Sequence, residues 1–185
     1  MVKSILSIPE RDTDGKIIVS LTPADTTHWQ RVARDRIEYV RRHGLGNRHG
    51  ENTVLNGERN HKLGACGEKA VSLLLGIPWD EHLGIVTLSD VGHYEVRAID
   101  QPNRSLILHK EDKDAAIFIL VVLHGEFGAW HSGELAGWLY GHEGKHQSYW
   151  RDPTGENRWA FFVPNRRPPL YQMILLPTIE RKVVA

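Results

Sequence analysis

The pattern of apolar and polar positions predicts two helices in the first half of the chain. The first begins among the turn formers of Thr22–Thr27 and ends at Gly44. Its apolar residues recur three or four positions apart, at Trp29, Val32, Ala33, Ile37 and Val40. A second helix is expected from about Lys62 to Leu75, stopped by Gly76-Ile77-Pro78. Between them, residues 43–60 are predicted to form a polar loop.

Shorter apolar runs in the second half of the chain predict strands. Two-residue alternation at Tyr94–Ile99 indicates a strand with one buried face, and the unbroken apolar run Ala115–Leu123 is typical of a sheet centre. Further strands are expected at Gly15–Leu21, Ile85–Leu88, Ser105–His109, Phe127–Trp138, Trp159–Val163 and Leu170–Leu176. We therefore expect an α/β (α+β) fold in which a central mixed β-sheet is flanked by helices.

The composition is that of an ordinary globular protein. The chain has 185 residues, of which 41% are hydrophobic and 25% charged, so we expect a single domain, 1–185. Its one cysteine, Cys66, excludes an intramolecular disulfide and fits a reducing cytoplasm. The first residues lack the apolar core of a signal peptide, and the longest apolar run is too short to span a bilayer. We expect a cytoplasmic protein with no membrane partner.

The formal net charge is zero, because 23 basic residues balance 23 acidic residues. This balance argues against a protein that coats nucleic acid without specificity. The basic residues are nevertheless concentrated, with six arginines against two acidic residues between His28 and Arg48. Among them Arg34, Arg41 and Arg42 are candidates for holding DNA phosphates, although the same helix face could simply be solvated.

The segment that begins at Asp90, DVGHYEVR, brings acidic and basic residues together. In a strand, Glu95 and Arg97 point to one face while the residues between and beside them point to the core. A tight turn at Gly92 would bring the Asp90 carboxylate toward Glu95. Magnesium prefers carboxylate and carbonyl oxygens, and nearby positive charge stabilises a phosphate under attack. Taken singly, the same residues are common as a turn former and as a solvated ion pair.

This arrangement, Asp…Glu-x-(Lys/Arg) after a helix that carries Glu68 in GACGE, resembles the PD-(D/E)xK nuclease superfamily. The longer order of features, with DVGxYEVR, a leucine-rich strand, a D-x-D turn and an apolar strand, resembles small phage-encoded members. The resemblance implies a restriction-endonuclease-like core at 61–165. The strand and basic helix of 1–60 would be an N-terminal addition, and 166–185 a C-terminal β addition and tail.

The resemblance also implies a role for each matching residue. Glu68, Asp90, Glu95 and the backbone carbonyl of Val96 would hold Mg²⁺ or Mn²⁺, and Arg97 would contact the scissile phosphate of DNA. Active members usually carry lysine at that last position, and arginine cannot act as a base. The chain is therefore expected to be a metal-dependent endonuclease or exonuclease. The alternative is a DNA-binding module that keeps the fold without the chemistry.

The same resemblance bears on assembly and location. Such nucleases often form homodimers, so a homodimer stays open for this chain. A phage-encoded member would act in the cytoplasm of the bacterial host.

A second metal motif is HExxH at His142, Glu143 and His146, the pattern of zinc hydrolases. Its chemistry requires one continuous helix, so that both histidines share a face. Gly144 weakens a helix interior, and Lys145 stands where such enzymes usually carry a small or apolar residue. A zinc hydrolase is therefore the lesser alternative.

Aromatic residues crowd the C-terminal half of the chain, close to several arginines. Such residues can stack nucleobases while arginines hold phosphates. In a small domain, however, most tryptophans fill the core. Trp150 and Arg151 are the pair that we expect to contact DNA.

Overall fold

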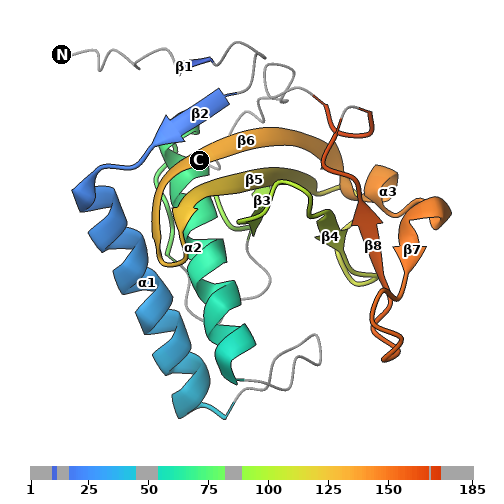
Figure 1. Ribbon diagram of the computed structural model, residues 1–185, viewed down its shortest axis with the longest axis horizontal. Coiled ribbons are helices and arrows are strands. Elements are labelled where there is room, and N and C mark those ends of the chain that lie inside the picture. The colour runs from blue at the N-terminus through green and yellow to red at the C-terminus, as the bar shows by residue number, and fades with distance from the viewer. Residues whose placement is uncertain (1–9, 12–16, 45–53, 82–88, 167, 172–185) are drawn as a thin grey trace, which may run out of the picture.

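The computed structural model describes residues 10–11, 17–44, 54–81, 89–166 and 168–171. In these ranges the chain forms two β-sheets and two long helices in layers (Figure 1). The helices are α1 (Pro23–Arg42) and α2 (Val54–Leu75), with a short α3 (Gly141–Gly144) and the 3₁₀ helix η1 (Gln147–Tyr149). None of the helices in the described part is long and apolar enough to cross a membrane.

The larger sheet has the strand order β1-β2-β6-β5-β3 and the smaller one the order β4-β8-β7. The larger comprises β1 (Glu10–Arg11), β2 (Ile17–Ser20), β6 (Ala129–Tyr140), β5 (Ile117–Glu126) and β3 (Tyr94–Ile99). The smaller comprises β4 (Leu106–Leu108), β8 (Ala160–Val163) and β7 (Trp150–Arg151). Strand β3 runs parallel to β5 and the other paired strands are antiparallel, which confirms an α+β fold with a mixed central sheet.

Helix α1 confirms its sequence signals. Thr22 caps it in a capping box with Asp25, and Pro23 opens its first turn. Its buried face carries Trp29 and Val32, as the periodicity predicts. The helix ends at Arg42, beside the predicted glycine stop.

Helix α2 begins at Val54, well before the predicted start at Lys62. The expectation of a loop over residues 43–60 is therefore wrong for 54–60, while 45–53 lie outside the described residues. The early turns are polar, and their charges are neutralised by distant partners that local sequence does not reveal. Glu58 pairs with Arg41 of α1, and Arg59 pairs with Asp100 beyond β3.

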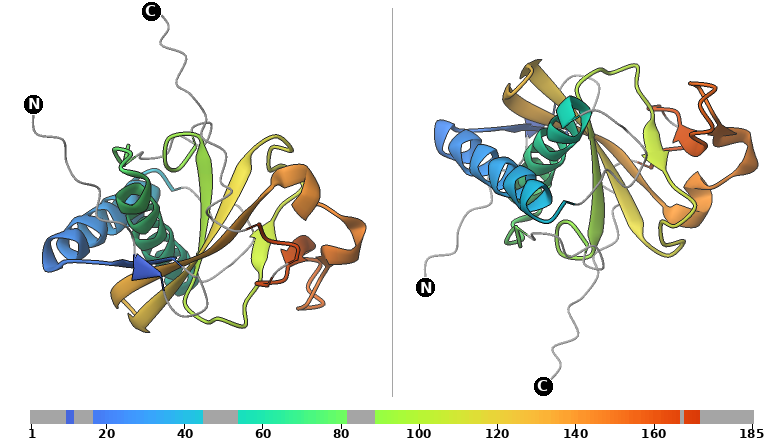
Figure 2. Two further views of the ribbon diagram at one scale, coloured as in Figure 1. Left: turned by 90° about the horizontal axis from the view of Figure 1, so that it is seen from above. Right: turned by 90° about the horizontal axis from the view of Figure 1, so that it is seen from below.

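Strand β5 explains why its sequence is apolar without interruption. Ile117, Ile119 and Val121 join the core beneath the helices, whereas Phe118 and Leu120 join a second core under the small sheet. Figure 2 shows the helices on one side of the larger sheet and the small sheet on the other. Both faces of β5 are thus covered, as expected for a central strand.

The N-terminal segment contributes Ile17, Trp29 and Val32 to the hydrophobic core beneath the helices. Strand β2 pairs with β6 through residues 17–20, and α1 packs along α2 (Figure 1). Of the other predicted strands, Ile85–Leu88 lies outside the described residues. At the C-terminal end, Tyr171 forms a bridge to Trp138, and residues 172–176 are outside the described part.

Candidate functional site

A tight turn places Asp90 beside β3. Val91 N donates to Tyr94 O at 3.1 Å, and Tyr94 N donates to Val91 O at 3.0 Å. Gly92 lies between them with φ +62, a conformation that glycine adopts without strain. The Asp90 Oδ2 atom then accepts a hydrogen bond from Val96 N at 2.7 Å. The turn predicted at the glycine is confirmed, and it fixes the Asp90 carboxylate against the strand.

The faces of β3 divide as its alternation predicts. Tyr94 and Val96 belong to the core beneath α2. Glu95 and Arg97 are only partly buried and lie on the opposite face. Among the described strands, β3 is an edge strand of the larger sheet. Because Asp90 binds the backbone of β3 at Val96 N, its carboxylate lies along this edge.

The Arg97 guanidinium lies among the oxygens that the sequence predicts as metal ligands. Its Nη1 atom is 3.7 Å from Asp90 Oδ2 and 3.9 Å from Glu95 Oε2. The same nitrogen donates to the backbone carbonyl of Val96 at 3.2 Å. Its other terminal nitrogen, Nη2, is 3.3 Å from Asp112 Oδ1. Two carboxylates and a carbonyl therefore converge on one positively charged nitrogen.

Glu95 carries the clearest electrostatic sign of crowding in this cluster. Burial raises the pKa of its carboxyl to about 7, and repulsion from Asp90 and Asp112 acts in the same direction. The neighbouring charges of Arg97 and Lys113 oppose this rise in pKa without cancelling it. The cluster is thus short of positive charge, even with a guanidinium inside it.

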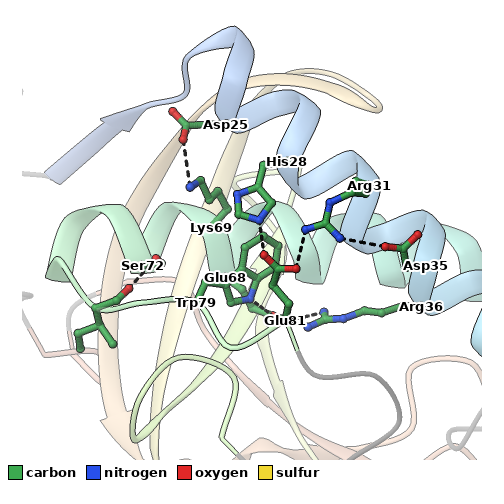
Figure 3. A network of polar contacts seen from close by, with 11 residues as sticks. Asp25, His28, Arg31, Asp35, Arg36, Glu68, Lys69, Ser72, Trp79 and Glu81 are labelled. Atoms are coloured by element: carbon green, nitrogen blue, oxygen red, sulfur yellow. Dashed lines mark hydrogen bonds and ion pairs between the residues drawn. The ribbon is translucent and has the colours of Figure 1, made fainter.

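Glu68 has other partners. The residue is 4% exposed, and its carboxylate accepts two hydrogen bonds from Arg36, at 2.7 and 2.6 Å. Trp79 Nε1 donates a third at 2.8 Å (Figure 3). Burial raises the pKa of Glu68, the hydrogen bonds from Arg36 oppose this, and the charge of Asp90 raises it further. Glu68 is therefore an electrostatic neighbour of Asp90 while its own oxygens are held by α1.

The position of α2 explains this difference. The helix covers the face of β3 opposite Glu95, and a Cβ atom added to Gly67 would lie 2.6 Å from Ala98 Cβ. Sequence reasoning missed Arg36, although its spacing of three and four residues from Ala33 and Val32 places it on the buried side of α1.

The described residues include no group of three or more His, Cys, Asp or Glu side chains that could hold a metal ion as they stand. Two arginine side chains pair with the predicted ligand carboxylates instead. Arg97 lies between Asp90 and Glu95, and Arg36 binds both oxygens of Glu68. The predicted ligands are thus divided into two sets, one on each side of the β3 edge.

The HExxH segment does not form the helix that zinc chemistry requires. Helix α3 ends at Gly144, and His146 caps the separate η1. Glu143 accepts hydrogen bonds from Tyr140 N at 2.9 Å and from Tyr171 Oη at 2.5 Å. His142 Nδ1 contacts the Asp114 carbonyl at 3.1 Å. The continuous helix expected for a zinc site at His142, Glu143 and His146 is therefore not formed, since glycine and local capping end α3 too early.

Lys145 of the same segment stabilises a neighbouring turn, a role that the sequence does not predict. Its Nζ donates to the carbonyls of Lys110, at 2.9 Å, and of Asp112, and to Asp114 Oδ1 at 2.8 Å. A Cβ at Gly141 would collide with the carbonyl of Lys113, so α3 lies directly against this turn. Lys145 thereby holds the turn that presents Asp112 to Arg97.

The predicted DNA-contact residues lie on opposite sides of the molecule (Figure 1). On α1, Arg34, Arg41 and Arg42 are exposed, and the last two pair with Glu58 and Glu38. Arg34 and Arg41 also line a cavity of about 550 Å³ between α1, α2 and the β5–β6 turn. At the other end, Trp150 and Arg151 form β7 of the small sheet.

No family model, curated protein or solved structure matches this chain. The case for a function therefore rests on its residues and their geometry.

Proposed function

We propose that the chain is a metal-dependent nuclease that hydrolyses phosphodiester bonds of DNA, with a restriction-endonuclease-like core of the PD-(D/E)xK type. One observation carries this proposal. Oxygen atoms of Asp90, Glu95 and Val96 all lie within 4 Å of a single cationic nitrogen, Nη1 of Arg97. A turn, a strand and a backbone carbonyl have thus been brought around one point that favours positive charge.

The donor set fits Mg²⁺ or Mn²⁺. All the converging atoms are hard oxygens, and two belong to carboxylates. Burial, followed by the charges of Asp90 and Asp112, raises the pKa of Glu95 to about 7, and positive charge placed beside a carboxyl favours its ionised form. When bound, a divalent ion supplies Lewis-acid stabilisation of the charge that develops on a phosphate oxygen. The carboxylates of Asp90 and Glu95 and the carbonyl of Val96 would hold the ion.

The remaining residues take complementary roles in this proposal. Arg97 contacts the scissile phosphate, because its guanidinium keeps its charge and presents several donors to phosphate oxygens. Asp112 orients Arg97 through the contact at Nη2. Glu68 is a further ligand, available once the hydrogen bonds from Arg36 and Trp79 are released. The arginines of α1 and the Trp150–Arg151 pair serve as more distant DNA contacts.

A second candidate is a DNA-binding module with the same fold and no chemistry. Its specific support is again Arg97, which already neutralises Asp90 and Glu95 without an added ion. In that case the cluster serves folding, and Arg97 stands where a lysine would serve catalysis. The two candidates predict different results when divalent ions are added.

The test is a cleavage assay on supercoiled, linear and branched DNA with Mg²⁺ or Mn²⁺. The nuclease proposal predicts cleavage that Glu95→Gln abolishes. As a matched control, Glu111→Gln removes an exposed carboxylate from the adjacent turn and leaves cleavage unchanged. His142→Ala is also expected to leave cleavage unchanged. Salt-sensitive DNA binding without cleavage would favour the module. If the chain neither binds nor cleaves DNA, both candidates are refuted.

A further inference from the structure

An aromatic pair projects from the small sheet at the end of the molecule away from α1. The Trp150 and Trp159 rings are stacked, with centroids 5.8 Å apart and planes at 22°. Trp150 packs in turn against Phe161, at 4.6 Å between centroids, and Phe161 is part of the second core. Trp159 remains 48% exposed. Trp150 is therefore the support, and Trp159 presents an indole surface to solvent.

A cationic side chain lies over this aromatic pair, since Lys110 Nζ is 4.7 Å from the Trp150 ring centroid. Arg151 follows Trp150 in β7 and lies on the opposite face of the small sheet, 5.0 Å from the Phe162 ring centroid. The next residue, Asp152, accepts hydrogen bonds from backbone amides of its own turn, including Thr154 N at 3.1 Å and Asn157 N at 2.7 Å. Its carboxylate is thus directed at the backbone of that turn.

The aromatic pair is joined to the candidate cleavage site through a short turn. Lys110, whose ammonium lies over Trp150, opens the turn that Lys145 holds by hydrogen bonds. The same turn carries Asp112, which contacts Arg97. One fixed turn therefore extends from the stacked rings to the guanidinium that we assign to the phosphate.

We infer that Trp159 and Trp150 form a stacking site for an unpaired nucleobase, so that the substrate carries a single-stranded segment beside the position of cleavage. An exposed indole offers a π face to any base, and the adjacent Lys110 ammonium would hold a phosphate of the sugar–phosphate backbone. Bases within a duplex are stacked on both faces and cannot use such a surface. This inference deepens the proposed function and rests on it for the nature of the ligand.

The experiment measures binding of the full chain by fluorescence anisotropy, in chelator and without divalent ions, so that cleavage plays no part. The probes are labelled oligothymidylate, oligouridylate and a blunt-ended DNA duplex of two strands. The variants are Trp159→Ala, which removes the stacking surface, and Trp159→Phe, which keeps a smaller one. Phe127→Ala is the matched control, because Phe127 is 50% exposed and lies near Arg59 and Lys62 at the far β5–β6 turn.

We expect Trp159→Ala to weaken single-strand binding by roughly 5- to 150-fold, the range for loss of one stacked base. Trp159→Phe should retain most of the affinity, and duplex binding should change little in both variants. Phe127→Ala should bind like the wild type. Comparing the two single strands shows whether the ligand is DNA or RNA, and either result supports the stacking site.

The inference is overturned if the wild-type chain does not bind single strands, or if Trp159→Ala binds them normally. It is also overturned if single-strand and duplex binding fall equally. These outcomes are separate from the fate of the proposed function, which depends on cleavage with divalent ions and on Glu95. Circular dichroism of each variant shows that the fold is intact, as expected for a substitution at an exposed side chain.

Discussion

Removing the Arg36 guanidinium should destabilise the protein strongly, because the Glu68 carboxylate would stay buried without its counter-ion. The two side chains are 15% and 5% exposed, so water cannot replace the lost partner. Two charge-assisted hydrogen bonds, at 2.7 and 2.6 Å, would disappear while only Trp79 remained. Breaking a buried pair in this way costs about 3–5 kcal/mol. We expect that loss for Arg36→Met at pH 8.

The same reasoning predicts a pH dependence for this variant. Burial raises the pKa of Glu68, and the variant lacks the arginine that opposes that rise. An acid whose folded pKa exceeds its unfolded pKa loses stability as pH rises between the two values. The deficit of Arg36→Met relative to wild type should therefore shrink as pH falls, because protonation of Glu68 removes the unpaired buried charge.

Urea unfolding followed by circular dichroism at pH 5 and pH 8 measures both effects. The double variant Arg36→Met/Glu68→Met removes both charges and should recover most of the loss. Arg31→Met is the exposed control: Arg31 pairs with Asp35 and Glu81 at the surface, where ion pairs contribute little to stability, so the expected loss is small. A loss for Arg36→Met no larger than that of Arg31→Met, or one that does not change with pH, would refute the reasoning.

Three further substitutions or reactions test other parts of the structure. Lys145→Met should lower cleavage and cost about 1–3 kcal/mol, because the turn carrying Asp112 loses its charged donor; unchanged activity and stability would contradict this. Burial raises the pKa of Cys66 to about 12, so the thiol should react with a chromogenic disulfide at pH 8 only after the protein is unfolded in urea. Comparable reaction rates before and after unfolding would contradict this. Gly67→Ala should cost about 1–3 kcal/mol in urea unfolding, because its Cβ would lie 2.6 Å from Ala98 Cβ; wild-type stability would show that α2 shifts freely over β3.

The sequence predicts what depends on local pattern. Alternation places Glu95 and Arg97 on one face of β3, and Gly92 allows the turn that returns Asp90 to the strand. The uninterrupted apolar run of β5 reflects burial on both faces. In each case a periodicity or a backbone requirement acts within a few residues.

What the sequence does not predict depends on partners far along the chain. Arg36 and Glu68 are separated by the whole of the inter-helix connection, so their pairing follows from the packing of α1 on α2. The local pattern around Lys145 indicates only a poor fit to a zinc motif, whereas its hydrogen bonds are made to a turn more than thirty residues earlier. In both cases the surrounding charges, and not the local pattern, decide the role of the side chain.

The central claim is that Asp90, Glu95 and the Val96 carbonyl form a site for a divalent ion. Calorimetric titration of the full chain with Mn²⁺ tests it most directly. Wild type should bind the ion and Glu95→Gln should lose it. Arg97→Met should bind it more tightly while failing to cleave DNA, because the guanidinium competes for the same oxygens. Absence of Mn²⁺ binding in both wild type and Arg97→Met, or binding unaffected by Glu95→Gln, would contradict the account.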